Sequence, residues 1–103
     1  MDRIERLHQY LQTNPTDAFL QHALALEYIK IGNDAKAKAL FEEILLRDAT
    51  YVGSYYHLGK LLERTGETAA AIEWYQQGLT AAKAAGDNHS FNELRAALDD
   101  LVD

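Results

Sequence analysis

Histidine is the residue type in this chain best suited to holding a metal ion, and the sequence contains four of them. His22 and His57 lie in the middle part of the chain and could face each other in the folded protein. Zinc, however, requires three or four ligands in a fixed geometry. His8 and His89 belong to opposite ends of the chain, and no carboxylate is spaced to join the other two. We therefore expect no metal site, and we expect His22 and His57 to donate hydrogen bonds.

The sequence lacks the motifs of the common enzyme classes. It has no glycine-rich phosphate loop, no His-Glu-x-x-His, no Gly-x-Ser-x-Gly and no cysteine nucleophile. Two adjacent carboxylate pairs occur, at Glu42-Glu43 and Asp99-Asp100. Because neighbours in sequence point to different faces of a helix, neither pair is suited to acid–base catalysis. The sequence predicts no enzyme activity and no cofactor.

A mixed aromatic and charged face is the strongest indication of a binding surface. Tyr56, Lys60, Glu63 and Arg64 recur at helical spacings, opposite the leucines of the same segment. On a protein of net charge −6, such a face could attract an acidic segment or a terminal carboxylate. An ordinary solvated helix face would carry similar residues, so both interpretations stay open. The neighbouring Tyr51 and Tyr55, four residues apart, are expected to pack in the core.

Composition limits the class of protein and of partner. The chain has 103 residues, of which 48% are apolar and 25% charged, as in a soluble globular domain. A net charge of −6 argues against non-specific binding to nucleic acid or to an anionic membrane. The absence of cysteine suits a reducing compartment. The charged first residues lack the apolar core of a signal peptide, and no stretch is long enough for a membrane span, so we expect a cytoplasmic protein.

One pattern of apolar and small residues occurs twice, and the two copies are 34 residues apart. The first copy consists of Leu24, Ala25, Tyr28, Gly32, Ala37, Phe41 and Leu45. The second copy consists of Leu58, Gly59, Leu62, Gly66, Ala71, Tyr75 and Leu79. A period of this length, with small and aromatic residues at fixed offsets, is typical of a helix-turn-helix repeat. The small residues are expected where paired helices approach closely, with the aromatic residues filling the space beside them.

Hydrophobic periodicity and capping residues predict six helices. They are expected over 2–13, 17–31, 34–47, 51–65, 68–85 and 88–102. Thr16 and Asp17 are expected to supply N-cap oxygens for the second helix, and Thr50 is the predicted N-cap of the fourth. Either Asp87 or Ser90 caps the last helix, and Ser90-x-x-Glu93 fits a capping box. Gly32, Gly66 and Gly86 are expected to end helices in the left-handed conformation.

The repeated pattern resembles the tetratricopeptide repeat, over about residues 17–82, and the chain is similar to small bacterial proteins of this kind. The resemblance implies an all-α, right-handed helix-turn-helix solenoid forming a single domain. The domain would consist of a half-repeat helix at 2–13, repeats at 17–47 and 51–85, and a capping helix at 88–102.

The resemblance also implies a function, which is to bind a partner peptide in a concave groove lined by the first helix of each repeat. By this resemblance the groove residues are Phe19, His22, Leu26, Lys30, Tyr56, His57, Lys60 and Arg64. The expected partner is another protein or peptide, including an acidic segment, and not nucleic acid or a membrane. The alternative is a structural protein that self-associates through its end helices or its groove. Because both end helices carry charged outward faces, a monomer is favoured over a homodimer.

Overall fold

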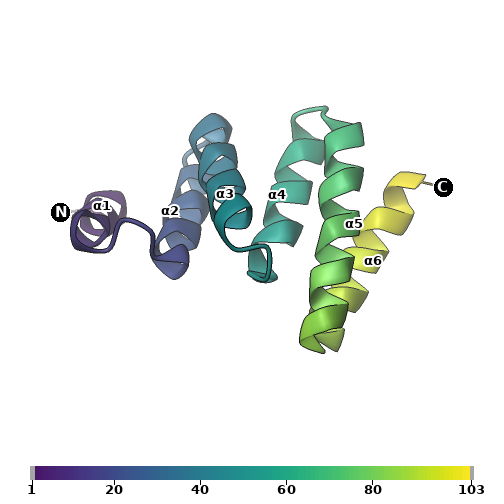
Figure 1. The fold of residues 1–103 in the computed structure, drawn as a ribbon. Helices are drawn as coiled ribbons and strands as arrows, with labels where there is room; N and C mark the ends of the chain where they lie inside the picture. The colour runs from purple at the N-terminus through teal and green to yellow at the C-terminus, as the bar shows by residue number, and fades with distance from the viewer. Residues whose placement is uncertain (1, 103) are drawn as a thin grey trace. The chain divides into compact units, whose positions relative to one another are not determined.

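The computed structural model describes residues 2–102, and all of its regular structure there is α-helical. The helices are α1 (Arg3–Thr13), α2 (Ala18–Lys30), α3 (Asp34–Arg47), α4 (Gly53–Arg64), α5 (Thr68–Ala85) and α6 (Asn88–Val102) (Figure 1). The fold class is therefore all-α, as predicted. The chain divides into two compact units, 1–47 and 48–103, which are described separately below. Of the helices within residues 2–102, none is both long and apolar enough to cross a membrane.

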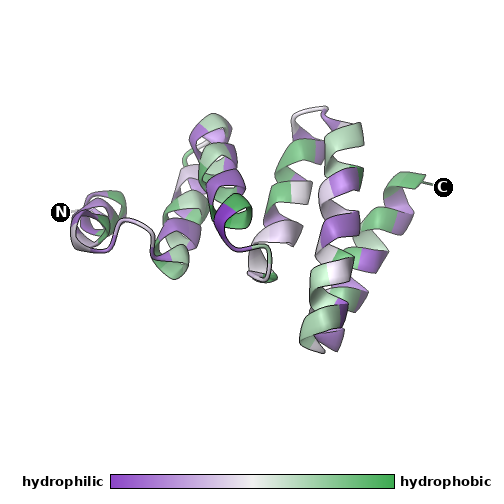
Figure 2. Ribbon diagram, in the orientation of Figure 1, coloured by the Kyte–Doolittle hydropathy of each residue, from purple (hydrophilic) through white to green (hydrophobic). Residues whose placement is uncertain are grey.

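The first unit contains α1, α2 and α3, with α2 packed against both of the others. Polar side chains start these helices: Asp2 accepts a hydrogen bond from the Glu5 amide, and Asp17 accepts one from the Leu20 amide. The predicted cap at Asp17 is thus observed. Each helix carries both hydrophilic and hydrophobic residues (Figure 2), and the apolar side chains form the core. Its buried members include Leu7, Leu24, Ala25, Tyr28, Ala37, Phe41, Ile44 and Leu45.

The second unit contains α4, α5 and α6, with α5 packed against both of the others and α4 also touching α6. The residues at the repeated small and aromatic positions are buried here too, which agrees with the prediction from the 34-residue period. The core includes Tyr55, Leu58, Gly59, Leu62, Ala71, Tyr75, Leu94 and Leu98. Three helix ends are closed by glycines with positive φ, at Gly32, Gly66 and Gly86, as expected.

The prediction that Thr50 caps α4 is wrong. The Asp48 carboxylate accepts hydrogen bonds from both the backbone amide and the hydroxyl of Thr50, so these groups are engaged in a local turn. The chain enters α4 through a further turn, in which the Ser54 amide donates to the Tyr51 carbonyl. Consequently α4 begins only at Gly53, after Val52, which makes no side-chain cap.

The last helix begins with Asp87, and the predicted Ser90-x-x-Glu93 capping box is wrong. The Asp87 carboxylate accepts from the Ser90 amide at 3.0 Å and from the Ser90 hydroxyl at 2.8 Å. Ser90 therefore lies inside the first turn and is held by the cap instead of acting as one. Of the two alternatives left open by the sequence, Asp87 is the residue that caps α6.

Within the second unit, the backbone of α4 at Gly59 lies directly against the ring of Tyr75 on α5. A Cβ atom at Gly59 would lie 2.1 Å from Cε1 and 2.5 Å from Cζ of Tyr75. Only a residue without a side chain leaves room for this buried ring. The small residue in the repeated pattern is thus a steric requirement for pairing α4 with α5.

Gly59→Ala should lower the free energy of unfolding by about 1–3 kcal/mol, because the added methyl group forces the ring of Tyr75 to move. Alanine is the better helix former, so without this clash the change would stabilise the chain. Gly53→Ala is the matched control in the same helix, because a Cβ there meets nothing within 4 Å. It should be neutral or stabilising by up to about 1 kcal/mol. Urea unfolding followed by circular dichroism measures both, and equal effects of the two substitutions would contradict the steric account.

Candidate functional site

Half of the predicted binding residues lie together on α2. Phe19, His22, Leu26 and Lys30 line one cavity of about 330 Å³, whose wall is completed by Arg3, Ala23 and Glu27. The helical spacing of these α2 residues places them on one face. Phe19 is 71% exposed, and among the exposed large apolar side chains of residues 2–102 it is the one that lines this cavity. Apolar surface is therefore available in a concave setting, which is the general character of a binding site.

Charged groups surround one side of this cavity. The Glu27 carboxylate lies 2.9 Å from Nζ of Lys30 and 3.4 Å from Nε of Arg3. Its side chain is only 16% exposed, whereas those of Arg3 and Lys30 are 60% and 70% exposed. One partly buried carboxylate thus holds two exposed cations, and the three groups together carry a net charge of +1.

His22 contributes to packing as well as to the cavity wall. Its ring meets that of Phe41 edge-on, with centroids 5.5 Å apart. Phe41 is fully buried on α3, so this contact fixes the orientation of the imidazole against the core.

The other half of the predicted residues lies on α4, in the second unit. Lys60 is 3.6 Å from the Glu63 carboxylate, and its ammonium group lies 5.7 Å from the ring centroid of Tyr56. The Tyr56 ring in turn meets that of His57 edge-on at 5.8 Å. Arg64 is exposed on the same helix. This face is therefore less basic than its sequence suggests, because Glu63 partly neutralises Lys60.

His57 adds little positive charge to the α4 face. Burial lowers the pKa of its imidazole below the ordinary value, and the nearby Glu93 carboxylate on α6 only partly opposes this shift. The neutral ring is accordingly favoured at neutral pH. A neutral imidazole has one donor and one acceptor nitrogen, and the expectation that this ring donates a hydrogen bond stays a prediction.

Glu63 also accepts a hydrogen bond from the Tyr75 hydroxyl, which comes from the buried side of α5. Desolvation raises the pKa of Tyr75, and the hydrogen bond to Glu63 and the charge of that carboxylate raise it further. Glu63 therefore links the core aromatic residue to Lys60 on the exposed face. Sequence periodicity placed Glu63 on this face, but it did not indicate that the Glu63 carboxylate lies within hydrogen-bonding distance of the Tyr75 hydroxyl.

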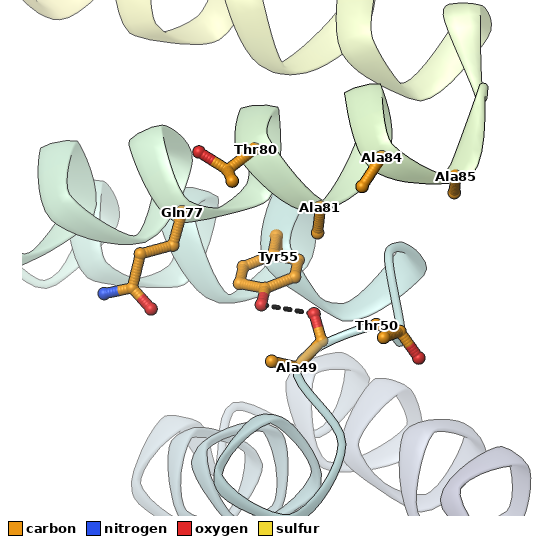
Figure 3. A pocket seen from close by; sticks show the side chains of 8 residues that line it. All are labelled: Ala49, Thr50, Tyr55, Gln77, Thr80, Ala81, Ala84 and Ala85. Carbon is orange, nitrogen blue, oxygen red and sulfur yellow. Dashed lines mark hydrogen bonds between the residues drawn. The ribbon is translucent and has the colours of Figure 1, made fainter.

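A second cavity, of about 480 Å³, lies within the second unit (Figure 3). It is lined by Ala49, Thr50, Tyr55, Gln77, Thr80, Ala81, Ala84 and Ala85. The Tyr55 hydroxyl donates to the Ala49 carbonyl at 2.6 Å, which ties the chain before α4 to the core. The lining is mostly apolar and contains no charged side chain.

Two residues of the α2 cavity were missed by sequence reasoning, namely Arg3 and Glu27. The signal for Glu27 was available, because it precedes Lys30 by three residues on the same helix. Arg3 could not be found from periodicity, since its position depends on how α1 packs against α2. Among residues 2–102 no group of three or more metal-ligating side chains comes together.

Comparison with known proteins identifies relatives of the same architecture. A family model of the tetratricopeptide repeat matches residues 20–51 and 52–84. The crystal structure of a tetratricopeptide repeat domain protein from Salinibacter ruber is 45% identical, with a TM-score of 0.79, covering 82% of this chain and 94% of that one. A TPR repeat-containing protein of Pseudomonas aeruginosa is 28% identical over 95 residues, which make up 92% of this chain and 90% of the relative. Human aspartyl/asparaginyl beta-hydroxylase is 26% identical over 85 residues, or 82% of this chain and 11% of that protein.

Tyr75→Phe tests the link between core and face through its pH dependence. The raised pKa means that folded Tyr75 keeps its proton at a pH where the unfolded residue, with a pKa near 10, loses it. The stabilisation that protonated Tyr75 gives to the folded state is thus fully present below about pH 10 and is lost as the pH rises further. We expect Tyr75→Phe to lower the free energy of unfolding by about 1–3 kcal/mol at pH 7. Between about pH 10 and 11, the free energy of unfolding should fall less steeply in this variant than in the wild type.

The matched control for this change is Tyr10→Phe, because the Tyr10 side chain is half exposed on α1. Urea unfolding of the three proteins between pH 7 and 11 provides the comparison. An alkaline loss of stability that is the same in the wild type and in Tyr75→Phe would contradict the assignment.

Proposed function

Because the chain belongs to the tetratricopeptide repeat family, we propose that it is an interaction module that binds a segment of another protein on the exposed faces of α2 and α4. Proteins with this repeat generally mediate protein–protein interaction, so the proposal concerns which surfaces of this chain do so. The two faces are those that carry the eight predicted binding residues.

The observation that carries the proposal is the exposed Phe19 beside a cavity on α2. Burying a side chain of this size in an interface contributes about 1.5–3 kcal/mol, so Phe19 could supply a substantial part of the binding free energy. His22 and Leu26 extend the same surface, and Lys30 supplies a charge at its edge. Aromatic anchors in concave settings commonly dominate binding energy.

The α4 face supports the same function with a different balance of groups. Tyr56 offers a partly exposed aromatic ring, and Lys60 lies over that ring while pairing with Glu63. Arg64 adds a further exposed cation. We propose that this face favours partner segments with acidic residues, although Glu63 weakens the preference.

We propose further that the module is not an enzyme. The family is generally non-catalytic, and the titratable groups on the two faces are engaged in ion pairs, ring contacts and hydrogen bonds that account for their positions.

Selection from a random peptide library displayed on phage tests the proposed surfaces. Peptides selected on the wild-type chain should lose most of their affinity for Phe19→Ala and should weaken with Lys60→Glu combined with Arg64→Glu. Leu46→Ala is the matched control, because Leu46 is 83% exposed on α3 and lies outside the proposed faces. Peptides that bind all variants equally, with the helices intact by circular dichroism, would refute the assignment.

We also propose that the chain acts as a monomer, which would leave these faces free. The ends support this, because Arg3, Glu5 and Arg6 are exposed on α1 and Arg95 and Asp99 on α6. Light scattering across a gel-filtration peak should therefore give a mass near 11.6 kDa at every loading concentration. A dimer that persists on dilution would favour the self-associating alternative.

A further inference from the structure

Resting on the proposed function, we infer that the cavity between α1 and α2 selects one type of partner sequence, namely a large apolar residue next to an aspartate or glutamate. The apolar side chain would enter the cavity against Phe19, Ala23 and Leu26, and the neighbouring carboxylate would meet Arg3 and Lys30 at its edge. The inference adds α1 to a surface that the repeat pattern assigns to α2 alone.

The size and lining of the cavity fit the apolar half of this pair. A volume of about 330 Å³ is ample for one large aliphatic or aromatic side chain, and is at the small end of ligand sites. Of the apolar residues that line it, Phe19 is exposed, Leu26 is partly exposed and Ala23 is buried. An inserted side chain would thus exchange water for contacts with carbon atoms on several sides.

The charges fit the acidic half. Arg3 and Lys30 share a single carboxylate, that of Glu27, and most of each cationic side chain remains in solvent. Arginine has five donors in a planar fork, so one contact to Glu27 leaves donors for a second carboxylate. An incoming cation, in contrast, would compete for a carboxylate that is only 16% exposed and already holds two cations.

The position of Arg3 depends on how α1 is held. Leu7 of α1 is buried, and Nε2 of His8 shares a hydrogen bond of 2.9 Å with the hydroxyl of Tyr28 on α2. These contacts place the first turn of α1, with Arg3, beside the last turn of α2, where Glu27 lies. The cationic edge of the cavity is therefore built by packing between two helices.

The phage-selected peptides test this preference directly, because their fusion to the coat protein leaves no free C-terminal carboxylate. We expect selection on the wild type to enrich a large apolar residue beside aspartate or glutamate. Synthetic versions of these peptides, amidated at the C-terminus, should bind Arg3→Glu at least about fivefold more weakly by fluorescence anisotropy. Glu27→Gln should bind them about two- to fivefold more tightly, because it removes the internal competitor for both cations.

Arg95→Glu is the charge-matched control. Arg95 lies on α6, its side chain is 59% exposed against 60% for Arg3, and it likewise pairs with one carboxylate, that of Asp99. Its reversal should leave peptide affinity within twofold of the wild type. Raising the salt to 0.5 M should shrink the effect of Arg3→Glu, since exposed charges are screened.

The outcomes separate this inference from the proposed function. Peptides that need Phe19 but show no acidic preference, or that respond equally to Arg3→Glu and Arg95→Glu, would overturn the inference and leave the proposed function standing. Weaker or unchanged binding by Glu27→Gln would also overturn it. If no selected peptide depends on Phe19, Lys60 or Arg64, both the proposed function and this inference fail.

Discussion

The contact between Gly59 and Tyr75 is the constraint on which the second unit depends. A ring can lie directly on the backbone of α4 only because that position has no side chain, and the ring then occupies the space between α4 and α5. The first unit carries the same arrangement of residue types, with Ala25 and Phe41 fully buried at the corresponding positions. The small and aromatic residues that recur every 34 positions thus mark the places where two helices pack closely.

The same aromatic positions connect the core to the proposed binding faces. Phe41 meets the ring of His22 edge-on, and Tyr75 donates to Glu63, which also holds Lys60. In each unit, therefore, a buried aromatic residue contacts a residue on a proposed binding face: Phe41 of α3 contacts His22 of α2, and Tyr75 of α5 contacts Glu63 of α4. Packing of this kind restricts side-chain freedom before a partner arrives, which reduces the entropy lost on binding.

The sequence was sufficient for the helices and the core, because period, small residues and glycine stops act locally. It was misleading for two helix N-caps, where two neighbouring residues could both act as the cap. Thr50 has the right type for a cap, but the Asp48 carboxylate engages it first, and Ser90 is held in the same way by Asp87. Of the proposed site, the face formed by Tyr56, Lys60 and Arg64 on α4 could be predicted from helical spacing, whereas the α2 residues followed from the resemblance to the repeat family. The contribution of Arg3 could not be predicted, because it depends on how α1 packs against α2, and neither could the hydrogen bond from Tyr75 to Glu63, which joins two helices.

The central claim is that partner segments bind on the exposed faces of α2 and α4. Its most direct test is a two-dimensional NMR titration of the ¹⁵N-labelled chain with one selected peptide, in which every shifted amide is assigned. The account predicts that the largest shifts fall in α2 and α4, with further shifts in the first turn of α1 next to the α2 cavity. Shifts confined to α3 and α5 would place binding on other surfaces and would contradict it.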